Sequence, residues 1–337
     1  MEGFLNAFVA LANFVLIPGL AYGAQLALGA LGVTLIYAVL RFSNFAHGDM
    51  MAFGTMVTIL VTWMLQAAGI GLGFLPTALI ALPFGIAGAV LLALGTDRLV
   101  YRFYRKQRAA PVTFVIVSVG VMFVYNALVR LFIGVDDRRF EDGERFVIRA
   151  NEFRDWTGLA EGLALRTSQV LTVVVAVAAM AALFWFLQRT RTGKAMRAYS
   201  DNEDLALLSG IDPGRVVLIT WALAAALATL AGVLYGLDKS FRPFNYFQLL
   251  LPIFASAIVG GIGNPIGAVI GGFVVAFSEV GVTYAYRRVL AHMLPETWMP
   301  EGVVQLLSTD YKFAVSFFIL VVVLLVRPTG ILRGRVI

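Results

Sequence analysis

Cysteine is absent from the 337-residue chain, and histidine occurs only twice, as His47 and His292. The lack of cysteine excludes a disulfide framework, a thiolate nucleophile and cysteine-ligated zinc or iron–sulfur clusters. With so few histidines, a histidine-rich metal site is not expected either. The sequence therefore predicts no metal or other cofactor held by this chain, and no catalytic residues.

Charged residues are also scarce. Asp, Glu, Lys and Arg make up 14% of the chain and hydrophobic residues 60%, whereas about 25% of a typical soluble domain is charged. A soluble fold could not bury this much apolar surface. Because roughly 20 apolar residues cross the hydrocarbon core as a helix, we expect residues 1–337 to form a single transmembrane domain. The predicted fold is an all-α integral membrane protein, a polytopic helical bundle of about eight to ten transmembrane segments.

The net charge of +6 arises from short basic stretches beside apolar runs, so a nucleic acid partner is not expected. Residues 98–108, 189–215 and 327–335 are basic, and the positive-inside rule assigns such connections to the cytoplasm. Residues 134–167 and 284–312 are longer, are mixed in charge and are assigned outside. No basic residue precedes the first apolar run, so a cleaved signal peptide is not expected. The predicted chain is multi-pass, with a cytoplasmic C-terminus.

Apolar runs occur at residues 8–40, 52–69, 75–96, 111–133, 168–187, 215–236, 249–282 and 313–327. The first and the seventh are too long for one simple helix. The seventh must cross twice or re-enter, because the sixth run ends outside near Asp238 and the connection after the seventh, from about Tyr284, is also assigned outside. Its centre predicts a break near Gly260–Gly267 from a cluster of turn formers: Gly260, Gly261, Gly263, Asn264, Pro265 and Gly267. The first run fits either one long tilted helix or two crossings with a kink near Pro18.

The segment Asn44-Phe45-Ala46-His47-Gly48-Asp49 interrupts apolar sequence with an amide, an imidazole and a carboxylate. Ionisable groups at membrane depth are costly and usually functional. Asn44, His47 and Asp49 are therefore candidates for lining or gating a translocation pathway. The alternative is that this segment is the solvent-exposed end of a helix, with Asn44 capping the helix that follows. Both interpretations stay open, because the sequence does not give the depth of His47.

The glycine cluster also has two interpretations. In the first, its small residues let helices pack closely. In the second, Gly260, Gly261, Gly263 and Asn264 belong to a broken helix that exposes backbone groups to a polar solute near the membrane midplane. The second is favoured, because the topology independently requires a break here.

Residues 193–211 have a helical pattern within the second basic connection. Asp201 or Asn202 is placed to cap a short helix that ends at Gly210. This helix carries three leucines, Leu205, Leu207 and Leu208. An exposed leucine-rich side normally packs against another surface, and a partner protein is favoured over the lipid surface.

Together these motifs resemble those of the branched-chain amino acid ABC transporter permeases, a family that includes related urea and amide permeases. Residues 44–49 resemble the family signature, 193–211 its cytoplasmic coupling loop and 260–272 its glycine-rich re-entrant segment. Arg327-Pro328-Thr329-Gly330-Ile331-Leu332 resembles its C-terminal end. The resemblance assigns to ATPase coupling Gly193, Arg197, Asp201, Asn202, Leu205, Leu207, Leu208 and Gly210.

The resemblance implies the permease subunit of an ATP-driven importer in a bacterial inner membrane. Two permeases, identical or related, would form the pathway within the lipid bilayer. Two cytoplasmic ATP-binding subunits would dock on the coupling loops, and an external solute-binding protein would deliver a branched-chain amino acid or a similar small polar solute. The chain lacks a G-x-x-x-x-G-K-[ST] phosphate loop, so ATP would be used by the separate subunits.

Two departures from the family leave the solute open. Residues 136–166 and 287–311 are longer than is usual, and Pro252 stands where relatives often have a lysine. Urea, short amides and aromatic acids therefore remain alternatives to a branched-chain amino acid.

The main rival is a secondary transporter driven by an ion gradient. It would need acidic groups within the spans, where the sequence offers little beyond Asp49 and Glu279. An enzyme that uses His47 and Asp49 is not expected, because no nucleophile or set of metal ligands accompanies them. Of the isolated residues, His292 is interpreted as a surface or packing residue and Arg242 as an interfacial cation. Glu279 fits a helix–helix hydrogen bond or a pathway role equally well.

Overall fold

The computed structural model describes residues 2–140, 145–295 and 302–332. Nine helical segments of this part are long and apolar enough to span a membrane. They are Glu2–Leu40 (α1, Glu2–Leu11; the π-helical turn η1, Ala12–Leu16; α2, Ile17–Leu40), α3 (His47–Ala67), Ala78–Lys106 (α4, Ala78–Thr96; the π-helical turn η2, Asp97–Tyr101; α5, Arg102–Lys106), α6 (Pro111–Ile133), α8 (Thr167–Arg189), α11 (Pro213–Asp238), α12 (Pro243–Gly260), α13 (Pro265–Thr283) and Thr309–Val326 (the 3-10 turn η4, Thr309–Tyr311; α15, Lys312–Val326). The predicted all-α, polytopic fold is confirmed.

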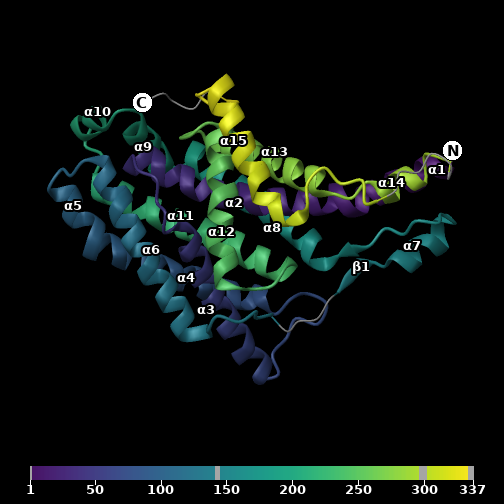
Figure 1. Cartoon of the computed structure of the whole chain (residues 1–337). Helices are drawn as coiled ribbons and strands as arrows, with labels where there is room; N and C mark the ends of the chain where they lie inside the picture. Colours follow the sequence, from purple (N-terminus) through teal and green to yellow (C-terminus); the bar gives the residue numbers. More distant parts are fainter. Residues whose placement is uncertain (1, 141–144, 296–301, 333–337) are drawn as a thin grey trace.

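Shorter elements connect these segments. They are the helices α7 (Ala150–Thr157), α9 (Arg191–Asp201), α10 (Glu203–Leu208) and α14 (Arg287–Ala291), and the strands β1 (Phe146–Ile148) and β2 (Leu165–Arg166), which pair in antiparallel fashion. Figure 1 shows the long helices gathered in one bundle, from which α1, α7 and α14 project to one side.

The first apolar run forms one continuous helix rather than two crossings. It runs for 39 residues from Glu2 to Leu40, and at about 1.5 Å per residue it is about 58 Å long. This is well beyond a hydrocarbon core of about 30 Å. Pro18 lies in the first turn of α2, directly after η1. The wider π turn accommodates a proline that lacks a backbone N–H.

Helix α2 lies at the centre of the bundle. Its residues from Ala21 to Ile36 are all buried, and it packs against α8, α11, α12 and α13. Small residues allow this close approach, since a Cβ added at Gly272 of α13 would lie 2.7 Å from the backbone nitrogen of Ala27. In lipid, such backbone-to-backbone contacts are a main source of helix association. A helix that is covered on all sides has no polar face, which is why the sequence of α2 is apolar all round.

The seventh apolar run is divided into two helices, as predicted. Helix α12 ends at Gly260 and α13 begins at Pro265. The connecting turn uses positive φ angles of 112° at Gly261 and 84° at Gly263. Residues with a Cβ rarely adopt this conformation, so glycines are required there.

The same glycines also let α12 and α13 touch along their backbones. A Cβ added at Gly260 would overlap the carbonyl of Gly267, and one added at Gly271 would overlap the carbonyl of Ser256. The same cluster therefore forms both the break and the close contact between α12 and α13.

A lateral arm projects from the bundle at the N-terminal end of α2 (Figure 1). It consists of α1, α7, α14 and the β1–β2 pair, and it contains parts of the two connections that the sequence assigned outside. Residues 141–144 and 296–301 of these connections lie outside the described residues, as do residues 333–337 of the basic tail.

Glu161 holds the lateral arm together. Its backbone N–H donates to Oδ1 of Asn6 at 3.0 Å, and its Oε1 accepts a hydrogen bond from Nε of Arg288 at 2.7 Å. The same Oε1 lies 3.0 Å from Nε2 of His292. Glu161 thus joins α1 through its backbone and the α14 region through its carboxylate. His292 is a packing residue of this arm.

Acidification is expected to loosen the lateral arm. Burial acts to raise the pKa of Glu161, but hydrogen bonds from Arg288 and His292 outweigh burial and lower that pKa below the usual carboxyl value. The ionised carboxylate therefore stabilises the arm above an unfolded-state pKa of about 4.3. This stabilisation is lost as the pH falls from that value through the lower folded-state pKa.

Hydrogen–deuterium exchange of residues 2–11 and 287–292, corrected for intrinsic rates, checks this prediction. Protection should be lower at pH 3.5 than at pH 7 in the unaltered chain. Glu161→Gln should give weak protection at both pH values. If the unaltered arm is equally protected at both, Glu161 does not stabilise it.

Candidate coupling site

Three segments that the sequence singled out meet at one end of the bundle, which we call the coupling end. It consists of residues 41–49, helices α9 and α10, and the turn 261–264 between α12 and α13. In Figure 1, α9 and α10 lie on the side of the bundle away from the lateral arm. The guanidinium of Arg41, at the end of α2, donates to the backbone carbonyl of Ser200 in α9. This contact links the first two segments directly.

Helix α9 is attached to the bundle by its buried face. The Thr190 side chain caps it, accepting a hydrogen bond from the backbone N–H of Gly193 at 3.0 Å. Any side chain at position 193 would overlap the backbone carbonyl of Phe186. Met196 and Tyr199 are buried. Gly193, predicted as a coupling residue, is therefore placed where α9 packs on the end of α8.

Helix α10 presents its leucines to the surroundings. Asn202 caps the helix by accepting the backbone N–H of Leu205 at 3.0 Å, and Asp201 is the last residue of α9. The exposed fractions of Leu205, Leu207 and Leu208 are 61%, 44% and 85%. The helix is followed by Gly210 with a φ of 78°. In the part of the chain that the structure describes, this apolar surface is uncovered.

Acidic residues flank these leucines. Glu203 and Asp204 form the exposed first turn of α10, and the Tyr199 hydroxyl donates to Oε1 of Glu203 at 2.6 Å. A membrane surface that carries anionic lipids is negatively charged and would repel two carboxylates. A protein surface therefore suits α10 better than a lipid surface.

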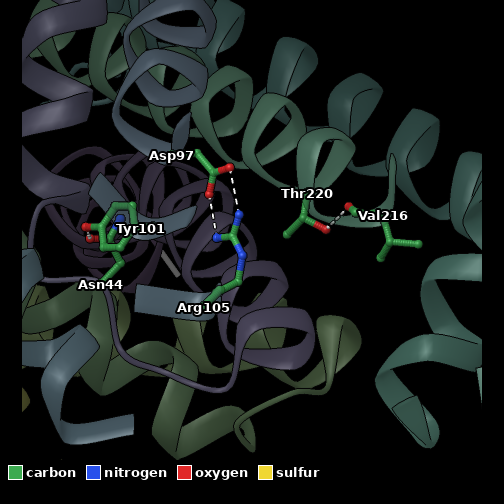
Figure 2. Close-up of polar contacts among 6 residues, drawn as sticks. All are labelled: Asn44, Asp97, Tyr101, Arg105, Val216 and Thr220. Carbon is green, nitrogen blue, oxygen red and sulfur yellow. Dashed lines mark hydrogen bonds and ion pairs between the residues drawn. The ribbon is translucent and has the colours of Figure 1, made fainter. Parts of the chain in front are cut away.

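Asn44 stabilises the turn before α3 without capping that helix, which corrects the predicted alternative. The N-cap is Ala46, and Oδ1 of Asn44 accepts hydrogen bonds from the Ala46 backbone N–H at 3.2 Å and from the Tyr101 hydroxyl at 3.3 Å (Figure 2). Tyr101 stacks on Trp221 of α11 with ring centroids 5.1 Å apart. The turn is thus held by side chains of η2 and α11, which only the tertiary fold brings there.

A bidentate ion pair lies beside this turn. Nη1 and Nη2 of Arg105 donate to Oδ1 and Oδ2 of Asp97 at 2.6 and 2.8 Å (Figure 2). Such paired, parallel hydrogen bonds fix the orientation of both groups. The nearby Thr220 hydroxyl bonds within α11, to the Val216 carbonyl at 2.8 Å (Figure 2). Both residues belong to the Ala78–Lys106 helix, so the ion pair links its η2 and α5 parts.

His47 and Asp49 are fully buried and belong to the packing of α3. A Cβ added at Gly32 of α2 would lie 2.7 Å from Cε1 of His47. Oδ1 of Asp49 accepts a hydrogen bond from Nδ2 of Asn126 in α6 at 2.7 Å. The six-residue motif is therefore divided between a turn, in which Asn44 is buried, and the packed start of α3.

A cavity of about 550 Å³ opens at the coupling end. Its wall from α2 and α8 is apolar, whereas α9 contributes cations and a carboxylate. The lining residues are Leu35, Ala38, Val39, Leu187, Lys194, Met196, Arg197, Ala198, Ser200, Asp201, Gly263, Asn264 and Pro265. The fold thus brings four of the sequence candidates, from two distant segments, to one cavity. The pathway candidates that do not line it are Asn44, His47, Asp49, Gly260 and Gly261.

Two residues of this site were not predicted. Lys194 lines the cavity, and Arg41 links α2 to α9. Both are cations in polar segments that follow apolar runs, and basic residues that only set the topology occur in the same position. No pattern in the sequence separated these two from the other basic residues of the connections.

Removing the Tyr101 hydroxyl is expected to loosen the 41–46 turn without unfolding the bundle. Tyr101→Phe loses one buried hydrogen bond, worth about 1 kcal/mol, and so should raise hydrogen exchange of this turn about fivefold. Tyr104→Phe is the matched control, because the Tyr104 hydroxyl makes no hydrogen bond to the described residues. Equal exchange in both variants would show that the Tyr101 bond does not hold the turn.

Comparison with known proteins assigns the chain to a family. Residues 15–324 match the model described as branched-chain amino acid transport system / permease component. The chain belongs to this family. This permease is 32% identical over 326 residues to the high-affinity branched-chain amino acid transport system permease protein LivH of Escherichia coli (strain K12), with 94% of each chain covered.

Two further relatives are also branched-chain amino acid transport permease proteins. The permease is 30% identical to the high-affinity branched-chain amino acid transport system permease protein BraD of Pseudomonas aeruginosa, over 95% of each chain. It is 26% identical to a probable branched-chain amino acid transport permease protein LivH of Methanocaldococcus jannaschii, over 95% of this chain and 92% of the relative. These relatives are transport permeases rather than enzymes. The resemblance drawn from the motifs is confirmed.

Proposed function

We propose that this permease is the membrane-spanning subunit of an ATP-binding-cassette importer. It moves a branched-chain amino acid or a similar small polar solute into the cytoplasm by alternating access. The observation that carries this proposal is the exposed leucine surface of α10, which is joined through α9 to a cavity bounded by the α12–α13 turn. A partner that binds α10 can move α9, which packs against α2, α8 and α11 and shares the cavity with the α12–α13 turn.

The charge distribution supports a cytoplasmic coupling end. An odd number of crossings places the two termini on opposite sides of the membrane, and nine candidate spans are found among the described residues. The coupling end carries the basic residues of α5 and α9, as expected for the cytoplasmic side. We therefore place the C-terminus in the cytoplasm of a bacterial cell with the permease in its inner membrane, and the lateral arm outside.

This orientation gives each surface a partner. Two ATP-binding subunits use the ATP. One docks on α10 of this permease and the other on the second permease. A solute-binding protein approaches from the side of the lateral arm. A second permease, identical or related, completes the pathway, and lipid covers the remaining apolar faces. Gly263 and Asn264, which line the cavity, gate the cytoplasmic mouth together with Gly261 of the same turn, while Asn44, His47, Asp49 and Gly260 move with the segments that they pack.

The alternative is an ion-gradient-driven secondary transporter, and the environment of Glu279 weighs against it. This buried carboxylate of α13 accepts a hydrogen bond from the Ser316 hydroxyl of α15. The ammonium of Lys312, on the same helix as Ser316, lies 5.7 Å from the ring centre of Tyr22 in α2. A carboxylate that joins packed helices in this way serves as a helix–helix contact rather than an open ion ligand.

Uptake by membrane vesicles distinguishes the two. Vesicles that contain the permease with its co-purifying subunits, and a binding protein outside, receive radiolabelled leucine. The importer takes up label with internal ATP and without an imposed gradient. Uptake that needs a proton or sodium gradient and no ATP would instead identify a secondary transporter. Competition by unlabelled valine, phenylalanine, urea and acetamide identifies the solute class.

A further inference from the structure

The last described residues of the chain fold back over the α12–α13 turn. We call residues 327–332 the C-terminal strap. The backbone N–H groups of Ile331 and Leu332 donate to the carbonyls of Val259 and Gly260, at 2.8 and 3.2 Å. The last carbonyls of a helix have no partner within that helix. The strap therefore caps the end of α12 from outside.

Asn264 joins this strap to the start of α13. Its Oδ1 accepts hydrogen bonds from the backbone N–H groups of Ile266 and Gly267, at 3.1 and 3.2 Å. Its Nδ2 donates to the backbone carbonyl of Leu332 at 3.1 Å. One amide side chain thus uses both of its ends, one on α13 and one on the strap.

Gly330 brings the strap into backbone contact with the turn. A Cβ added there would lie 2.5 Å from Cα of Gly261 and 2.8 Å from the carbonyl oxygen of Ile258. Its φ of 79° is also unfavourable for any residue with a Cβ. No larger residue fits without moving the strap away from the turn.

The turn has a second side, which faces the cavity. Gly263 and Asn264 line that cavity together with Arg197 and Asp201 of α9, and no strap residue takes part in the lining. The turn therefore lies between the strap and the cavity. Without the strap, the carbonyls of Val259 and Gly260 and the side-chain amide of Asn264 would lose these hydrogen bonds. The turn would then deform when α9 moves.

We propose that the C-terminal strap is a positioning element for energy coupling. It holds the α12–α13 turn rigid, so that a displacement of α9 by the docked ATP-binding subunits is passed to α12 and α13 instead of being absorbed by the turn. Asn264 and Gly330 are its positioning residues. This inference rests on the proposed function, and it assigns the chain end a mechanical role in that function.

Asn264→Asp is the sharpest test. Aspartate keeps the acceptor that caps α13 but loses the donor to the Leu332 carbonyl. We expect faster hydrogen exchange in residues 327–332 and a fall of at least about fivefold in solute transported per ATP hydrolysed, as for the loss of an energetic coupling. Asn151→Asp makes the same change at an exposed position of α7 and should alter neither quantity.

Gly330→Ala provides an independent second variant. Its control is Gly73→Ala, because Gly73 has a similarly positive φ of 66° but open space around the added Cβ. Gly330→Ala should release the strap and lower the transport ratio, and Gly73→Ala should not. The ratio of transport to hydrolysis separates coupling from stability, since a merely destabilised permease loses both activities together.

The outcomes are distinct. If both variants release the strap and the transport ratio stays unchanged, the strap is only a helix cap and the inference is overturned. If neither variant changes exchange in residues 327–332, these contacts do not hold the segment, which also overturns it. Absence of ATP-driven uptake by the unaltered chain would instead be a failure of the proposed function.

Discussion

Changing Leu205, Leu207 and Leu208 together to aspartate should abolish binding of the ATP-binding subunits. Burying a leucine in an interface contributes about 1.5 to 3 kcal/mol, so three such losses, with charge added, should weaken binding by at least about a thousandfold. These side chains are exposed in the isolated permease. The bundle should therefore keep its thermal stability while its partner is lost.

Co-purification in mild detergent, with bound proteins identified by mass, measures this effect. Leu306→Asp is a suitable control, because Leu306 is equally exposed but lies in the connection before α15, which is assigned outside. The control should retain the partner. If the triple variant also retains it, α10 is not the docking surface, and the argument from its exposed leucines fails.

Gly267→Ala should destabilise the permease severely. A Cβ at position 267 would lie 2.8 Å from the carbonyl carbon of Gly260 and would overlap its oxygen. Both groups are backbone, so neither can rotate away, and α12 and α13 must separate. Overpacking of this kind costs about 1 to 3 kcal/mol, and more where backbone must move. Thermal unfolding and the yield of monodisperse protein in detergent measure the loss.

At two other helical positions, changing glycine to alanine should not destabilise the permease. Gly95 of α4 and Gly120 of α6 are helical glycines around which an added Cβ meets nothing within 4 Å. Gly95→Ala and Gly120→Ala should be neutral or stabilising by up to about 1 kcal/mol, because alanine is the better helix former. A similar effect at all three positions would mean that helix contact at Gly267 is not close.

The fold was predictable from local signals. The apolar runs gave the spans, because only a continuous apolar helix satisfies its backbone in lipid. The break at Gly261–Gly263 followed from glycines, since those φ angles exclude other residues. The cap of α10 by Asn202 was foreseen with Asp201 as an equal choice, because a cap depends on only a few neighbouring residues.

The candidate site was only partly predictable. The sequence named Asn44, His47 and Asp49 as pathway candidates, but all three are buried, the first in a turn and the other two in helix contacts. In the sequence, a charged or polar residue beside an apolar run looks the same whether its side chain lies in a turn or in a helix contact. How deeply such a side chain is buried depends on which helices pack over it, and the sequence of a single span does not specify those helices.

The sequence by itself determined the all-α membrane class, the division of the seventh run and the exposed leucines of α10, because each depends on residues within a few turns of one another. The tertiary structure alone decided that Arg41 meets Ser200, that Asn264 meets Leu332, and that α9 and the α12–α13 turn share a cavity. These contacts join segments far apart in sequence. Close packing of helices, which glycines permit only in one arrangement, selects them.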